Sequence, residues 1–166
     1  MSEIIMNRSD IVAFAAITET TTSGGTSTTT TTNYRMTKFS KFSPNKNAKE
    51  YNRQYVDEIA ETSDVVGYAP AIDYSFDAHR NNPVHTYIRK VTDDENIGDS
   101  ATIVIYDVDT TNGDAYKRTY AIIPAAQGDS LNAYTYSGTL KAKGEAVHGT
   151  ATTSDDWKTC TFTEDE

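Results

Sequence analysis

The sequence is poor in cysteine and leucine, and each shortage excludes a class of protein. Cys160 is the single cysteine among 166 residues, so no internal disulfide framework can hold the fold. Leu131 and Leu140 are the only leucines, whereas a helical protein of this length would carry many more. No apolar run approaches the roughly 20 residues that a membrane-spanning helix needs. The chain therefore depends on a hydrophobic core, and its length is typical of one domain.

Positive charge is scarce in one half of the chain. The formal charge of -9 comes from 24 acids and 15 bases. Residues 1–91 hold ten acids and ten bases, so residues 92–166, with fourteen acids and five bases, carry the whole excess. An acidic surface repels phosphate, which argues against a protein that grips nucleic acid.

The N-terminal segment lacks the pattern of a secretory signal. The stretch "MSEIIMNRSDIVAFAAIT" holds one short apolar run, preceded by an acid and by no basic region. We therefore expect an intracellular soluble protein.

Histidine-based metal and catalytic motifs are missing as well. His79 and His85 flank the start of a predicted helix and His148 lies far away, so we expect solvated or capping side chains and not metal ligands. Cys160 lies in a predicted strand without a His/Asp setting, which indicates a small buried hydrophobe.

A calcium-loop interpretation of "DVDTTNGD" (107–114) also fails. Counting from Asp107 places Asn112 at position 6, where glycine is required, and Arg118 at position 12, where glutamate is required. The Asn112-Gly113 pair is better explained as the turn of a β-hairpin. Together with the missing motifs, this leads us to expect no catalytic residue, no metal site, no cofactor and no enzymatic activity.

Threonine, tyrosine, valine and isoleucine are abundant, and they favour β-strands. Residues 10–18 form an apolar run that predicts a strand buried on both faces. Ile72, Tyr74 and Phe76 alternate with polar residues within 63–77 and predict a strand with one buried face. Further strands are predicted at 33–42, on both sides of "TTNG", and at 131–142, 144–153 and 157–163. The fold class is therefore all-β, a sandwich or barrel with one short α-helix.

The helix is predicted within residues 81–94. Asn82 can cap its N-terminus, and Pro83 suits the first helical position. A helix of about ten residues cannot stand alone, so it must dock on a sheet. The predicted docking face comprises Val84, Tyr87, Ile88 and Val91.

Residues 43–61 are ambiguous from local pattern alone. Ser43 and Pro44 resemble a helix start, and Tyr51, Tyr55 and Ile59 lie at helical spacing. However, Tyr51, Arg53 and Tyr55 also alternate as a strand would. Helix and strand are both compatible with this segment.

A threonine-rich strip lies between the first two predicted strands. Residues 18–32 contain ten Thr, two Ser, two Gly and one Glu. The composition disfavours a helix, and Gly24-Gly25 favours a tight reversal. Because a long polar loop buries nothing of its own, we expect it to project and to contact another subunit or ring. The predicted contact residues are Ser23, Gly24, Gly25, Thr26, Ser27, Thr28, Thr29, Thr30 and Thr31.

Several segments, taken in order, resemble the major tail tube proteins of tailed bacteriophages, in particular those of phages and prophages of Firmicutes. They are "IIMNRSDIVAFAAIT", "YRMTKFSKFSPN", "EYNRQYVDE", "DVVGYAPAIDYSFD", "NPVHTYIRKV" and "SGTLKAKGEAVHGTAT". The resemblance spans nearly the whole chain. It implies a single tail tube domain over residues 1–166, with an N-terminal arm at 1–9 and a Thr-rich projecting loop at 18–33. It also implies that residues 51–60 are extended.

The resemblance further implies a virion protein, assembled in the cytoplasm of a bacterial host. Its partners would be itself, as six-membered rings stacked into a tube, together with tape measure, tail terminator and baseplate or tail-tip proteins, and a sheath if the tail contracts. DNA would pass through the lumen as non-specific cargo, and no membrane would be bound. A net-negative lumen would keep DNA mobile. The candidate lumen acids are Asp93, Asp94, Asp107, Asp109 and Asp114.

Two other interpretations remain open. Tyrosine richness and the Thr-rich strip also suit a secreted or cell-surface β-sandwich that binds carbohydrate, although no signal peptide supports it. An acid-pair hydrolase on a β scaffold rests on loose carboxylates alone.

Overall fold

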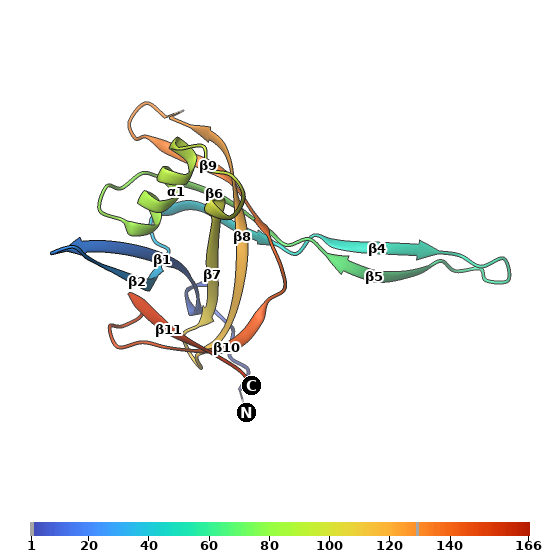
Figure 1. Ribbon diagram of the computed structural model, residues 1–166. Helices are drawn as coiled ribbons and strands as arrows, with labels where there is room; N and C mark the ends of the chain where they lie inside the picture. The colour runs from blue at the N-terminus through green and yellow to red at the C-terminus, as the bar shows by residue number, and fades with distance from the viewer. Residues whose placement is uncertain (1, 129) are drawn as a thin grey trace.

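The computed structural model describes residues 2–128 and 130–166, and it is mainly β-sheet with one short α-helix, as the sequence predicts (Figure 1). The strands are β1 (Ile11–Ser23), β2 (Thr26–Arg35), β3 (Phe39–Asn45), β4 (Ala48–Arg53), β5 (Thr62–Tyr68), β6 (Ala71–Asp77), β7 (Thr102–Asp109), β8 (Asp114–Gln127), β9 (Thr135–Ala142), β10 (Val147–Thr152) and β11 (Thr159–Glu164). The helices are α1 (Pro83–Asp93) and the 3-10 turns η1 (Arg8–Asp10) and η2 (Gly98–Ala101).

Nine antiparallel strands form one sheet that closes partly on itself. Their order is β10-β11-β2-β1-β7-β8-β9-β6-β3, and β10 pairs with β8 as well as with β11. Strand β8 is long enough to pair with two strands in succession. Its residues 114–117 pair with β10, and its residues 120–127 pair with β9. Six strands thus close into a small barrel, and β9, β6 and β3 continue the sheet beyond it.

Strand β1 supplies side chains to two separate cores, as its apolar run predicts. Val12 and Phe14 lie with Tyr106 and Val108 in a cluster built from barrel strands. Ala15 and Ile17 lie in the larger cluster, which also receives β6, β9 and α1. A strand with buried residues on both faces needs a continuous apolar sequence, which explains the run at 10–18.

The helix α1 begins where its capping residues predict. The Asn82 side chain accepts hydrogen bonds from the backbone N–H groups of Val84 and His85, and Pro83 occupies the first turn. Val84, Ile88 and Val91 are buried in the larger core, and Tyr87 packs against it. The helix therefore closes one side of the larger core and has a fixed position on the sheet.

Asn112 and Gly113 lie in the turn between β7 and β8. Gly113 has a φ of +84°, and its N–H donates to the carbonyl of Asp109 at 2.8 Å. The Asn112 side chain accepts from the N–H of Asp114. The hairpin interpretation of this segment is confirmed.

The structure corrects two strand predictions. The expected strand at 33–42 is broken between Arg35 and Phe39, where Lys38 has a φ of 61° and the Met36 N–H bonds to Ala13 outside the β2 ladder. The extended segment expected at 51–60 is also wrong beyond Arg53, because residues 54–61 turn the chain between β4 and β5. The helical alternative for 43–61 is excluded, since residues 43–45 and 48–53 lie in β3 and β4 and the rest of this segment forms turns and irregular connections.

Candidate functional site

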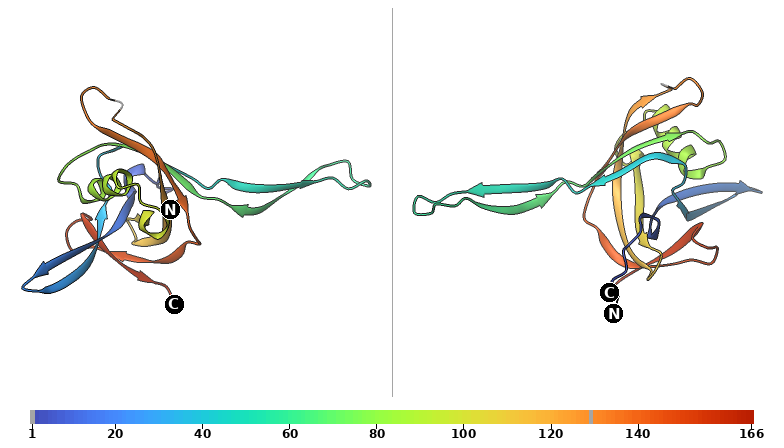
Figure 2. Two further views of the ribbon diagram at one scale, coloured as in Figure 1. Left: turned by 45° about the horizontal axis from the view of Figure 1, so that its top comes forward. Right: turned by 180° about the vertical axis from the view of Figure 1, so that it is seen from behind.

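Strands β4 and β5 form a hairpin that projects away from the body, and we call residues 48–68 the arm (Figures 1 and 2). The two strands pair with each other as a separate two-stranded sheet. An isolated two-stranded hairpin is at best marginally stable in water. An arm of this kind therefore gains stability from contact with a partner.

The arm exposes an unusual number of large apolar side chains. They are Tyr51, Tyr55, Val56, Ile59, Val65, Val66 and Tyr68. Val56 and Ile59 are fully exposed, at 109% and 100% of their reference areas. Fully burying one such side chain contributes about 1.5–3 kcal/mol. Clustered apolar exposure of this kind marks an interaction surface.

The tip of the arm, residues 54–61, holds its own shape through local hydrogen bonds. The Gln54 amide donates to the carbonyls of Glu58 and Ile59, and the Glu58 N–H donates to the Tyr55 carbonyl. The tip carries three acids, Asp57, Glu58 and Glu61, beside its apolar residues. It thus presents an apolar and acidic surface without needing to fold on contact.

Arg53 links the two strands at the outer part of the arm. Its guanidinium lies 2.7 Å from the Asp64 carboxylate and over the rings of Tyr51 and Tyr55. Because both charged groups are partly exposed, this pair contributes little stability, about 0–1 kcal/mol. The pair with Asp64 and the contacts with two tyrosine rings therefore gather around one guanidinium.

The Thr-rich strip forms a second projecting hairpin, on the opposite side of the body from the arm (Figure 2). Strands β1 and β2 stay in register from Phe14↔Arg35 to Ser23↔Thr26, and Gly24 and Gly25 form the turn with positive φ. The segment 18–33 is therefore a β-hairpin and not an irregular loop. All residues from Ser23 to Thr31 are exposed.

Hydroxyl pairs run along one face of this Thr hairpin. Thr18 bonds to Thr31 at 2.9 Å, Thr20 to Thr29 at 3.2 Å, and Thr22 to Ser27 at 3.0 Å. Cross-strand pairs of this kind contribute about 0.2–1 kcal/mol each. The repeated threonine thus forms a polar ladder of hydroxyl pairs across the two strands. This ladder gives the many hydroxyls of the strip a structural role.

A hollow with basic walls lies beside the connection between β2 and β3, and we call it the basic groove. Its volume is about 500 Å³. Arg8, Arg35 and Lys38 line it together with apolar residues, and no acid does. The half-buried apolar lining comprises Ile11, Ala13, Met36, Phe39 and Phe42. An adjoining hollow shares Arg35, Met36 and Lys38 and adds Lys158, so the positive charge extends past the groove.

The five candidate lumen acids do not gather on one surface. Asp93 and Asp94 lie at the C-terminal end of α1, whereas Asp109 and Asp114 flank the turn at the far end of β7 (Figure 1). Asp107 is half-buried within β7, and burial raises its pKa while Lys46, Arg8 and Arg118 oppose that effect. The structure does not bring these residues together within one chain.

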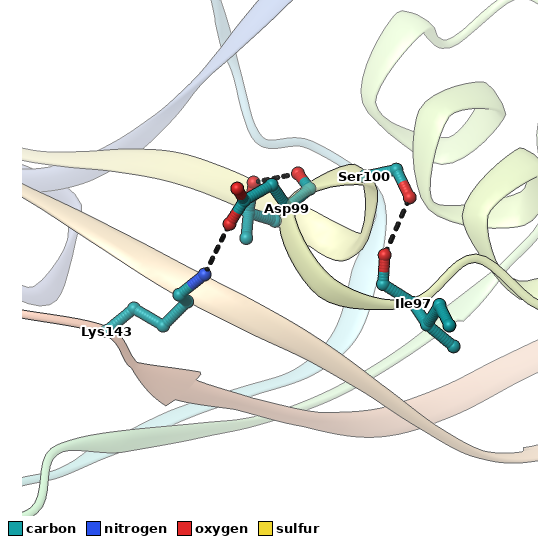
Figure 3. Close-up of polar contacts among 5 residues, drawn as sticks. Ile97, Asp99, Ser100 and Lys143 are labelled. Carbon is teal, nitrogen blue, oxygen red and sulfur yellow. Dashed lines mark hydrogen bonds and ion pairs between the residues drawn. The ribbon is translucent and has the colours of Figure 1, made fainter.

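Some of the acidic excess is neutralised locally. Lys143 donates to Asp99 at 2.9 Å, and the pKa of Asp99 is lowered by this contact (Figure 3). The same turn, η2, is closed by the Ser100 hydroxyl, which donates to the Ile97 carbonyl. Lys117 pairs with Glu164 in the same way, at 3.3 Å. The surface charge is therefore more mixed than the composition of residues 92–166 indicates.

The histidine prediction needs a correction at His85. Its side chain is fully buried and stacks on Phe76, with Phe39 and His79 packed edge-on. The ring lies one position beyond Val84 on the docking face of α1, so it belongs to the core. It is neither a solvated nor a capping side chain.

Cys160 is buried as predicted, and burial raises its pKa to about 11, so the thiol stays protonated at neutral pH. Among residues 2–128 and 130–166, no group of three His, Cys, Asp or Glu side chains could hold a metal ion. Over the same residues, no helix is long and apolar enough to cross a membrane.

Sequence comparisons give no relative. No protein-family model matches the chain, and no curated protein does. Among solved structures, the chain is similar to a protein in the cryo-EM structure of the anti-feeding prophage (AFP) baseplate, determined with 6-fold symmetry. The TM-score is 0.45 and the identity is 9%, over 89% of this chain and 97% of that chain.

Proposed function

We propose that the protein is a structural subunit of a phage-type tail. Copies assemble into six-membered rings that stack into a tube, and DNA passes through that tube. The sequence resemblance to major tail tube proteins, which runs in order along nearly the whole chain, is the first support. In this assignment the protein is a virion component with no catalytic role, and its partners are further copies and the proteins at the two ends of the tube.

The observation that carries the proposal is the arm. It projects from the body, exposes Val56 and Ile59 fully, and has no second sheet to cover it. An unpartnered β-hairpin with apolar faces is unfavourable in a monomer and favourable in an assembly. The Thr hairpin projects on the opposite side. A subunit with extensions on two sides can contact two neighbours, which an extended assembly requires.

A ring is one of the assemblies that this shape allows if the two contact surfaces differ. Contacts between unlike surfaces repeat head to tail, and they generate either rings or open helical filaments. The net charge of -9 per chain multiplies in such an assembly. We propose that the channel is net negative, which would keep DNA from binding its wall.

Negative-stain microscopy of the purified chain tests the proposal. We expect rings or tubes with a central channel, together with a large species in sedimentation velocity. A further expectation is that duplex DNA shows no retention on the assembled material at physiological salt. A chain that stays monomeric, or one that binds a polysaccharide column as a monomer, would contradict the proposal and favour a carbohydrate-binding module.

A further inference from the structure

The tip of the arm and the basic groove have complementary character. The tip presents the apolar residues Val56 and Ile59 with the acids Asp57 and Glu58. The groove presents an apolar floor, including Phe39 and Phe42, with a rim of three bases. Each surface thus offers both an apolar contact and a charge that matches the other.

The groove is a basic site on a strongly acidic protein. No ion pair within the described residues involves Arg8, Arg35 or Lys38. The charge of Arg8 nevertheless acts to lower the pKa of Asp107. Another hollow, between β1 and α1, has Glu19 beside Arg80 and Lys90, so its charge is mixed. The basic groove therefore favours an acidic occupant more clearly than this other hollow does.

The apolar lining of the groove favours a protein side chain over a phosphate backbone. Its floor contains half-buried Met36, Phe39 and Phe42, which a phosphate chain would leave without apolar contact. Val56 and Ile59 are side chains that gain by leaving water. An occupant with apolar residues flanked by carboxylates satisfies both parts of the groove.

We propose that the tip of the arm, residues 54–61, docks into the basic groove of a second copy of this chain. Val56 and Ile59 cover the aromatic floor, and Asp57 and Glu58 face Arg35 and Lys38. The inference rests on the proposed self-assembly and specifies which surfaces meet. Because the arm extends away from its own body, the tip does not occupy the groove of its own chain (Figures 1 and 2). The contact joins two unlike surfaces, so it can repeat head to tail from one copy to the next.

Charge reversal on each surface tests this pairing in the full-length protein. The tip variant carries Asp57→Lys and Glu58→Lys, and the groove variant carries Arg35→Glu and Lys38→Glu. Each variant alone places like charges opposite each other, so association should weaken at least about tenfold in sedimentation velocity. Two control variants, Glu145→Lys with Asp94→Lys and Lys90→Glu with Arg80→Glu, make the same charge changes at exposed sites away from tip and groove, and they should associate like the wild type.

Recombining the reversed charges gives the sharper result. A chain carrying all four changes restores opposite charges, so it should associate like the wild type. An equimolar mixture of the two variants should also associate, because each tip then meets a matching groove on the other variant. The proposal is overturned if the four-change chain is as defective as its parents while circular dichroism shows both folded.

A separate variant isolates the apolar part of the contact. Val56→Ser with Ile59→Ser should weaken association at every salt concentration, whereas the effect of charge reversal should shrink as salt screens it. Both residues are fully exposed in the chain, so the fold should be unaffected. Association equal to the wild type would overturn the docking. Duplex DNA binding that the groove variant abolishes, with no effect of the tip variant on association, would also overturn it.

The docking and the proposed function fail in distinguishable ways. If microscopy shows rings or tubes that the tip and groove variants leave intact, the docking is wrong and the tube assignment stands. If charge reversal controls association but the product is a small oligomer without a channel, the docking stands and the tube assignment is wrong. A wild-type chain that remains monomeric up to millimolar concentration overturns both.

Discussion

His85 lies face to face with Phe76, with ring centroids 4.3 Å apart and planes inclined by 27°. The Nε2 atom of His85 lies 2.9 Å from the Thr37 carbonyl oxygen, and Nδ1 accepts the backbone N–H of His79 at 3.2 Å. These partners require a neutral ring that carries its proton on Nε2. A single buried imidazole thus joins α1 to the β2–β3 connection and to the segment after β6.

This arrangement predicts a specific loss of stability in mild acid. Burial lowers the pKa of His85 below its usual 6.5; the charge of His79 acts in the same direction, and the Thr37 carbonyl and Asp77 oppose both. The unfolded chain therefore binds a proton more readily than the folded chain. Stability is complete above the unfolded pKa and falls as pH drops below it, by up to about 1.4 kcal/mol per pH unit, until the folded pKa is reached.

Melting temperatures at about pH 7.5 and 5.5 would show the effect, because ordinary carboxylates titrate mostly below this range. His85→Phe should flatten the dependence, although it also loses the bond to Thr37. His148→Gln is the matched control, since His148 is exposed beside Tyr116 and should leave the slope unchanged. An equal slope in His85→Phe and wild type would contradict the assignment.

Ile88 is fully buried at the centre of the helix docking face, so it offers a direct test of that face. Ile88→Asp would bury an unpaired carboxylate, at a cost of several kcal/mol out of a total stability of about 5–15 kcal/mol. We expect a chain largely unfolded by circular dichroism. Thr86→Asp, at an exposed position of the same helix, should melt within a few degrees of the wild type. Similar melting of both variants would show that the face is wrongly assigned.

Much of the body could be predicted because its patterns are enforced by burial. The alternation of Ile72, Tyr74 and Phe76 and the capping signals Asn82 and Pro83 each have a local physical cause, and the structure follows them. The arm could not be predicted in the same way. Its apolar residues face no core within the chain, so their spacing carries no information about helix or strand.

The basic groove could not be predicted from the sequence for a different reason. Arg8 and Arg35 are distant in sequence, and they meet because β1 pairs with β2, which places Arg35 opposite Phe14. No local pattern marks such a site. For His85 a signal was present, since it lies three residues before Ile88 on the apolar stripe. The average behaviour of histidine instead led to the prediction of a solvated or capping side chain.

Gly138 of β9 has no room for a side chain. A Cβ atom there would lie 2.5 Å from the Ile123 carbonyl oxygen and 2.8 Å from the Tyr74 hydroxyl. Because one of these atoms is backbone in the neighbouring strand, the clash cannot be relieved by a rotamer change. Gly138→Ala should cost about 1–3 kcal/mol in chemical denaturation.

The arm provides the matched control for this substitution. A Cβ atom at Gly67 would meet nothing closer than 4.0 Å. Gly67→Ala should therefore change the free energy of unfolding by less than about 0.5 kcal/mol. Equal effects at the two glycines would mean that the packing between β8 and β9 is looser than described.

Shortening the Thr hairpin should separate folding from assembly. Removing residues 20–23 and 26–29 leaves Glu19 and Thr30 flanking the Gly24-Gly25 turn, as Ser23 and Thr26 flank it now. An even number of pairs is removed, so the remaining side chains keep their faces. The lost residues are exposed, and the melting temperature should stay within a few degrees of the wild type.

Assembly should respond differently, because the polar ladder has nothing to bury within its own chain. Under the proposed function, the shortened chain should give few or no stacked rings in negative-stain micrographs, whereas full-length Thr21→Ser with Thr28→Ser should assemble normally. The hydroxyl pairs of Thr18 with Thr31, Thr20 with Thr29 and Thr22 with Ser27 remain in that control. Normal tubes from the shortened chain would mean that the hairpin does not contact a neighbouring ring, and that the arm must account for the stacking by itself.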